Sequence, residues 1–213
     1  MLEKMDAFFE ARLVGYEEHM LNNIEGAAEF YPFTAKLLPH GHILDLGCGT
    51  GLELNWYFSA NPTAKVTGID LSEKMLAELA RKFPDRDLEL IQGSYFDLPL
   101  GENRFDGAVS VESLHHFTKA EKIPLYTRLR AALKPGASFI LTDYFARDDA
   151  EEQALRGELL RLKEAQGIAD ETFYHFDTPL TVEHEMEALT AAGFAKIEIL
   201  GRWAATCTLR AVK

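Results

Sequence analysis

The spacing of apolar residues along this chain changes at about residue 41. Before that point they recur every three or four positions, which predicts an amphipathic helix; these positions are Met5, Phe9, Leu13, Tyr16 and Met20. A second helix is predicted over residues 22–38, although Gly26 and Pro32 weaken it. After it, short apolar runs alternate with helical stretches.

The apolar runs have the length of buried strands and occupy residues 42–46, 65–70, 87–93, 104–111 and 137–145. Helical stretches with capping signals separate them. Ser72 precedes one that Pro84 ends. Thr118 and Glu121 form a capping box for another, which contains Pro124. Alternation over about five such units predicts a parallel sheet with helices on both faces.

This alternation stops after Arg147. An inserted helix that Gly167 closes is predicted from the spacing of Leu155, Leu159 and Leu162. A helix over residues 181–192 follows, and then two strands joined by a turn. We therefore predict an α/β fold, a doubly wound Rossmann-like parallel sheet with a C-terminal antiparallel hairpin strand. Residues 1–40 would form a helical lid on a domain of residues 41–213, with a helical substrate insert at about 146–182.

Composition narrows the class of protein. The 213 residues are 47% hydrophobic and 26% charged, which fits one globular domain. A net charge of −12 argues against a nucleic-acid-binding surface. Charges throughout the first residues argue against a signal peptide or a membrane span. The two cysteines, Cys48 and Cys207, form no disulfide framework, and we expect a reducing cytoplasm.

A glycine-rich loop follows the first predicted strand in "ILDLGCGTG", residues 43–51. Glycine costs conformational entropy, so a ligand approaching the backbone is the expected reason for it. The spacing Gly47, Gly49, Gly51 lacks the third glycine of a dinucleotide site, because Leu52 stands there. No Gly-Lys-Ser/Thr follows either. A nicotinamide-dependent oxidoreductase is therefore disfavoured.

Two carboxylates indicate which ligand the loop takes. Asp45 would repel a pyrophosphate but suits a cation. Asp70 ends the next strand, roughly where an acidic residue binds ribose in this architecture. A ribose with positive charge and no phosphate describes S-adenosylmethionine.

Five segments carry a resemblance: "ILDLGCGTG", "VTGIDLSEKML", "QGSYFDLPL", "FDGAVSVESLHHF" and "LKPGASFILTDY". In this order, over residues 41–145, the chain resembles the class I S-adenosylmethionine-dependent methyltransferases of small-molecule type. The resemblance implies that Asp45 holds the cofactor's amino group and Asp70 its ribose. It also implies that Gly47, Cys48 and Gly49 contact the methionine part through their backbone.

Further cofactor contacts follow from the same resemblance. Leu71 and Met75 would pack beside the adenine, and Val111 and Glu112 would border the methionine end. The adenine amino group would meet Ser94 and Tyr95, or else Asp97, where the family usually has an aspartate. On the N-terminal helix, Arg12 would pair with the cofactor carboxylate beside Tyr16.

Direct displacement at a sulfonium carbon mainly requires that the reactants be held in line. A base helps when the acceptor must lose a proton, and His116, with His115 beside it, is the candidate; local packing of the pair is the alternative. Asp143 and Tyr144 would face the substrate mouth, and residues 173–177 would form its wall or fill the core of the insert. No metal site is expected, because His175 and His184 lack a ligand set.

The predicted function is methyl transfer from S-adenosyl-L-methionine to a small molecule, with S-adenosyl-L-homocysteine as product. A non-catalytic cofactor-binding sensor or partner module is the alternative. Nucleic acid, protein and membrane partners are disfavoured, and a homodimer is left open. The sequence does not reveal the acceptor.

Overall fold

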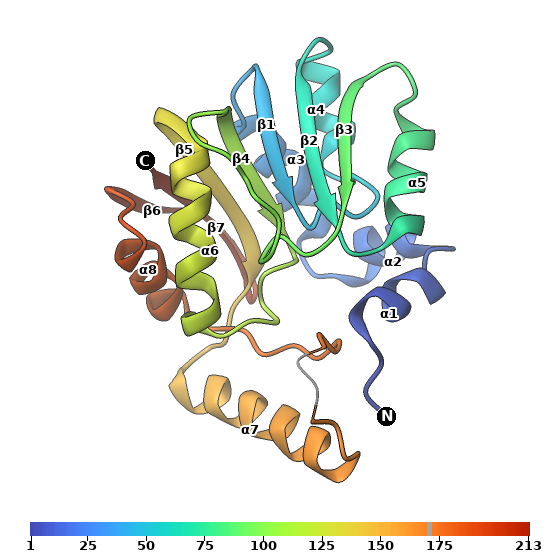
Figure 1. Cartoon of the computed structure of the whole chain (residues 1–213), viewed down its shortest axis with the longest axis vertical. Helices are drawn as coiled ribbons and strands as arrows, with labels where there is room; N and C mark the ends of the chain where they lie inside the picture. The colour runs from blue at the N-terminus through green and yellow to red at the C-terminus, as the bar shows by residue number, and fades with distance from the viewer. Residues whose placement is uncertain (170–171) are drawn as a thin grey trace.

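The computed structural model describes residues 1–169 and 172–213. Within them, the strands form one seven-stranded sheet in the order β3-β2-β1-β4-β5-β7-β6 (Figure 1). Their bounds are β1 His42–Leu46, β2 Lys65–Asp70, β3 Asp87–Gln92, β4 Phe105–Val111, β5 Leu133–Tyr144, β6 Lys196–Trp203 and β7 Thr206–Val212. The first five are parallel, whereas β7 runs antiparallel to both β5 and β6. The predicted doubly wound sheet with a C-terminal hairpin is confirmed.

Helices cover both faces because successive strand residues point to opposite sides. On β1, Leu44 joins the buried cluster that includes residues of α6 and α8, whereas Ile43 joins the cluster of α3, α4 and α5. The bounds are α3 Ala27–Leu37, α4 Leu54–Ala60, α5 Glu73–Lys82, α6 Lys119–Ala132 and α8 Val182–Ala191.

Local capping signals set where these helices begin. The Ser72 hydroxyl accepts a hydrogen bond from the Met75 amide at the start of α5. The reciprocal capping box of Thr118 and Glu121 starts α6 at Lys119, so Pro124 does not delay the helix.

The single N-terminal helix predicted from residue spacing is wrong. The segment forms α1 Met5–Ala11 and α2 Tyr16–Asn23, separated at Gly15, whose φ of +81° is a left-handed conformation that an α-helix cannot contain. A second left-handed glycine, Gly26, separates α2 from α3; a Cβ there would lie 2.4 Å from Trp203. The helix predicted over 22–38 therefore begins only at Ala27.

The N-terminal segment and the insert meet below the carboxyl ends of the parallel strands (Figure 1). Helix α7, Asp149–Ala165, lies apart from the sheet, and Gly167 follows it as predicted. Two further residues of the predicted insert, 170 and 171, lie outside the described residues. The Met5 amide donates to Phe173 O at 3.0 Å, and the His175 amide donates to Glu3 O at 3.0 Å. In the described parts of the chain, no helix has both the length and the apolar character that crossing a bilayer requires.

Candidate active site

The glycine loop after β1 leaves bare backbone at the carboxyl edge of the sheet. Gly47, Gly49 and Gly51 all have positive φ. A Cβ on Gly47 would lie 1.9 Å from Ser113 Oγ, so a larger residue cannot fit. A Cβ on Gly49 would meet no heavy atom within 4 Å among the described residues, so this glycine borders open space. Cys48 is buried and fills the turn, and burial raises the pKa of its thiol.

Asp70 connects this loop to the end of β2. Its carboxylate accepts hydrogen bonds from the Gly49 amide at 2.9 Å and the Ser72 amide at 2.8 Å. Burial raises the pKa of Asp70 despite these bonds. The side chain is thus fixed at the position from which the sequence predicts a ribose contact.

Two buried carboxyl groups lie behind the loop. Asp45 is 1% exposed and Glu53 is 4% exposed. Burial, with the neighbouring Glu53, raises the pKa of Asp45 well above its usual value; burial also raises the pKa of Glu53. The two side chains hydrogen-bond each other through a proton held by Asp45, and among the described residues Asp45 Oδ2 and Glu53 Oε1 have no other partner. A cation could bind this pair by displacing the shared proton.

The sequence interpretation missed Glu53. Its one signal is an acidic residue within the largely apolar stretch "GLELNW" directly after the glycine loop. A charged residue is unexpected at that place, because α4 packs its residues against the sheet, and this was the available sign that Glu53 has a role in the site.

The loop after β4 brings a histidine pair to the same edge. His115 is buried, with Nδ1 2.6 Å from Asp143 Oδ1 and Nε2 3.4 Å from Asp177 Oδ1. Burial alone would lower the pKa of His115, but the two carboxylates outweigh it and raise that pKa to about 10. Asp143 also accepts from the amides of Leu114 and Tyr144, so it lies buried behind His115.

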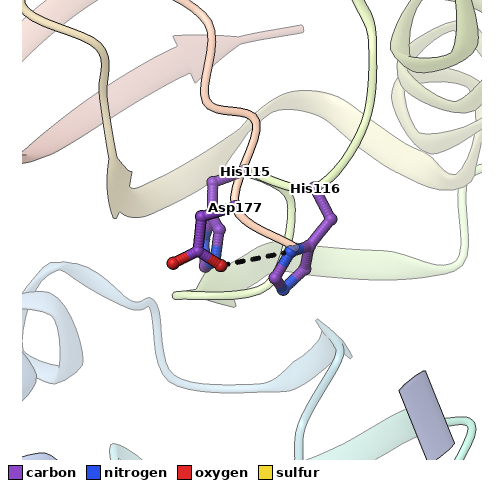
Figure 2. A group of neighbouring side chains, drawn as sticks. All are labelled: His115, His116 and Asp177. Carbon is purple, nitrogen blue, oxygen red and sulfur yellow. Dashed lines mark ion pairs between the residues drawn. The ribbon is translucent and has the colours of Figure 1, made fainter. Parts of the chain in front are cut away.

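His116 differs from its neighbour in its charge. Its Nδ1 lies 3.1 Å from Phe176 O, to which it donates as the neutral ring, so Nε2 keeps its lone pair. Burial and the adjacent His115 cation lower the pKa of His116. Figure 2 shows His115, His116 and Asp177 converging from two segments.

Two adjoining cavities both border His116. The smaller, about 50 Å³, is lined by Gly47, Gly49, Asp70 and Met75 among others. The larger, about 600 Å³, lies between α1 and α2 on one side and His115 and Asp177 on the other. Both are lined by Phe9, Tyr16, Glu112 and His116.

Glu112 stands at this junction in a strained conformation. Its φ is +49°, which non-glycine residues adopt at a cost and often at functional sites. Burial, followed by the charge of Asp143, raises the pKa of Glu112 to about 7. Thr206 donates a 3.0 Å hydrogen bond to its carboxylate. Val111, also predicted for the methionine end, lines the smaller cavity beside it.

The other predicted site residues do not line the smaller cavity. Tyr95 is buried and Leu71 packs against the core. Ser94 Oγ accepts from the Phe96 amide within its own loop, and Tyr144 lines a neighbouring cavity. Arg12 borders the larger cavity, but its guanidinium pairs with Glu3 at 2.9 Å and stacks on Phe8.

The region that holds the glycine loop and the histidine pair is similar to known proteins. Residues 43–136 match the family model described as "Methyltransferase domain". A sterol 24-C-methyltransferase of Gibberella zeae is 26% identical over 199 residues, covering 87% of this chain and 45% of that protein. A fatty-acid O-methyltransferase of Mycolicibacterium smegmatis is 28% identical over 149 residues, covering 69% of this chain and 52% of that protein. The chain thus spans about half the length of these curated relatives.

A solved structure shares the fold. The S-adenosylmethionine-dependent methyltransferase from Mesorhizobium loti superposes with a TM-score of 0.61 and 23% identity, over 85% of this chain and 96% of that one. The matched domain includes the glycine loop, Asp70 and the histidine pair. The family match over residues 43–136, these relatives and the shared fold together support assignment of the chain to the class I S-adenosylmethionine-dependent methyltransferases.

Proposed function

We propose that this chain transfers a methyl group from S-adenosylmethionine to a largely apolar small molecule. The observation that carries the proposal is the buried pair Asp45 and Glu53, which lies beside bare glycine backbone and whose two free oxygens have no partner in the described residues outside the pair. A cationic ligand without phosphate satisfies these groups, and a pyrophosphate does not.

The residues present fit this cofactor. Asp45 and Glu53 would hold its amino group, Asp70 its ribose hydroxyls, and Met75 would lie beside the adenine. Gly49 leaves room for the backbone contact. When bound, the cofactor supplies an electrophilic methyl group on a sulfonium sulfur.

The larger cavity supports a small, mainly apolar acceptor. Its walls include Phe8, Phe9, Met20 and Ile24, and about 600 Å³ is in the range of small-molecule sites. The names of the relatives, a sterol and a fatty-acid methyltransferase, agree with such an acceptor. In the metal-free protein, His116 Nε2 is the nitrogen that can accept a proton, while Asp143 positions His115.

Turnover tests this proposal directly. The 213-residue chain, incubated with S-adenosylmethionine and a panel of sterols, fatty acids and phenols, should form S-adenosylhomocysteine, measured by mass spectrometry together with the methylated product. Absence of cofactor binding in calorimetry would contradict the proposal. Binding without turnover over the whole panel would support the alternative, a non-catalytic sensor or partner module.

A substitution at Glu53 tests the cation site. Because the pKa values of both carboxyl groups are raised in the free protein, an ammonium that binds their ionised forms should displace a proton. The affinity for the cofactor should therefore rise as the pH rises through the pKa values of these two carboxyl groups. Glu53→Gln should weaken binding by about tenfold or more, through loss of a charged hydrogen bond, and reduce proton release.

The heat of cofactor binding is measured by calorimetry in two buffers of different ionisation enthalpy. Both are at pH 6, because the cofactor's amino group is fully protonated at that pH. Glu102→Gln, on an exposed loop, is the control. Equal binding heats in both buffers for the unmodified protein would refute the proposed cation site.

A cytoplasmic location and a homodimer remain proposals. The buried free thiols of Cys48 and Cys207 support a reducing compartment.

A further inference from the structure

We propose that His115, His116 and Asp177 bind a divalent first-row transition-metal ion at the wall of the larger cavity. Asp177 Oδ1 lies 3.4 Å from His115 Nε2 and 3.5 Å from His116 Nδ1. All three ligand atoms lie within 4.8 Å of one another. Metal bonds of about 2.0–2.2 Å to nitrogen and oxygen place neighbouring ligand atoms at about 3–3.5 Å, close to these two distances, and an ion would replace the hydrogen bond from His116 Nδ1 to Phe176 O.

The surroundings of His115 match those of a metal ligand. Its Nδ1 lies 2.6 Å from Asp143 Oδ1, and Asp143 is in turn fixed by the Leu114 and Tyr144 amides. Metal-binding histidines typically donate their second ring nitrogen to a carboxylate in this way, which directs the free nitrogen at the ion. Here Nε2 lies 3.4 Å from Asp177 Oδ1.

The proposed metal site is buried on its histidine side and open to the larger cavity on the side of Asp177. His115 and His116 are buried, whereas the side chain of Asp177 is 49% exposed and all three residues line the larger cavity. An ion there would keep a coordination position open toward the acceptor. His175 Nε2, 3.9 Å from the same oxygen of Asp177, stands beside that position.

The donor set selects the kind of ion. Two imidazoles and one carboxylate suit Fe²⁺, Co²⁺, Ni²⁺ or Zn²⁺, whereas Mg²⁺ prefers oxygen ligands alone. The expectation of no metal site rested on the lack of suitably spaced cysteines or carboxylates beside His175 and His184 in the sequence. The fold instead brings Asp177 to a histidine pair about 60 residues before it.

Metal binding goes beyond the proposed function, because it needs neither cofactor nor turnover. Coordination through Nδ1 would leave His116 protonated on Nε2, so His116 would not then act as the base. An acceptor oxygen or sulfur at the open position would lose its proton more readily beside the ion. The ion would thus replace His116 in preparing the acceptor.

Cobalt titration tests the site in the 213-residue chain after treatment with a chelator. Visible absorption bands of Co²⁺ should saturate at one equivalent, and Zn²⁺ but not Mg²⁺ should abolish them. Asp177→Asn and His116→Gln should each weaken Co²⁺ binding at least tenfold, and Asp143→Asn by about 10–100-fold. His184→Gln is the control, because His184 pairs with Glu152 at 2.9 Å outside the cluster.

Two outcomes would overturn the metal site: no saturation at one equivalent in the unmodified protein, or unchanged titrations of Asp177→Asn and His116→Gln. If these variants do not fold, X-ray absorption of the unmodified protein decides, since it should show two imidazoles on the ion. Cofactor calorimetry on Asp177→Asn separates the two proposals, because that variant should lose the metal and still bind S-adenosylmethionine.

Discussion

Asp70→Asn should lower the affinity for S-adenosylmethionine by about 100-fold or more. A carboxylate that accepts two ribose hydroxyls contributes about 1.5–3 kcal/mol per charged hydrogen bond, and 2.8 kcal/mol is about 100-fold. Asparagine keeps the shape, but its amide group can accept through only one oxygen. The substitution also weakens the contacts of Asp70 with the Gly49 and Ser72 amides, which hold the glycine loop.

Calorimetry measures this loss, with Asp87→Asn as the matched control. Asp87 is exposed and starts β3, at the end of the parallel strands opposite the site. Unchanged affinity in a folded Asp70→Asn variant would remove the ribose assignment, and a thermal melt establishes that the variant is folded.

Glu185→Leu should lower the free energy of unfolding by about 3–5 kcal/mol, because it leaves a charged lysine buried without its partner. Lys122 Nζ and Tyr126 Oη both donate to the Glu185 carboxylate, between α6 and α8. The side chains of Lys122 and Glu185 are each 1% exposed. The double variant Lys122→Met/Glu185→Leu should recover most of the loss, since apolar residues then fill the same space.

Urea denaturation followed by circular dichroism gives these values. Glu187→Leu is the control on the same helix, since its partner Lys119 and Glu187 itself lie at the surface and the pair should matter little. A loss in the double variant as large as that of Glu185→Leu alone would show that the carboxylate does not act by neutralising Lys122.

Features encoded in adjacent residues could be predicted from the sequence. The glycine loop, the caps at Ser72 and Thr118 and the strand runs are of this kind, because each depends on neighbours a few positions away. The break at Gly15 was missed, since apolar spacing continues through it and only the backbone angle shows the interruption.

Contacts between residues far apart in the sequence could not be predicted. Asp177 meets His115 only after the insert folds back, and Glu185 meets Lys122 only when α8 docks on α6. Spacing along the chain contains no sign of either contact. The site residues that were predicted mostly share a simpler property, which is their position at the carboxyl edge of the sheet.

The helices α1 and α2 have a consequence for the order of events in a catalytic cycle. The space of about 50 Å³ beside the glycine loop is lined in part by Phe9 and Tyr16, so under the proposed function we expect these two side chains to shift when a nucleoside binds there. The same two side chains also bound the larger cavity. Under the proposed function, cofactor exchange would therefore also open the proposed acceptor pocket, which would close again before the next acceptor is bound.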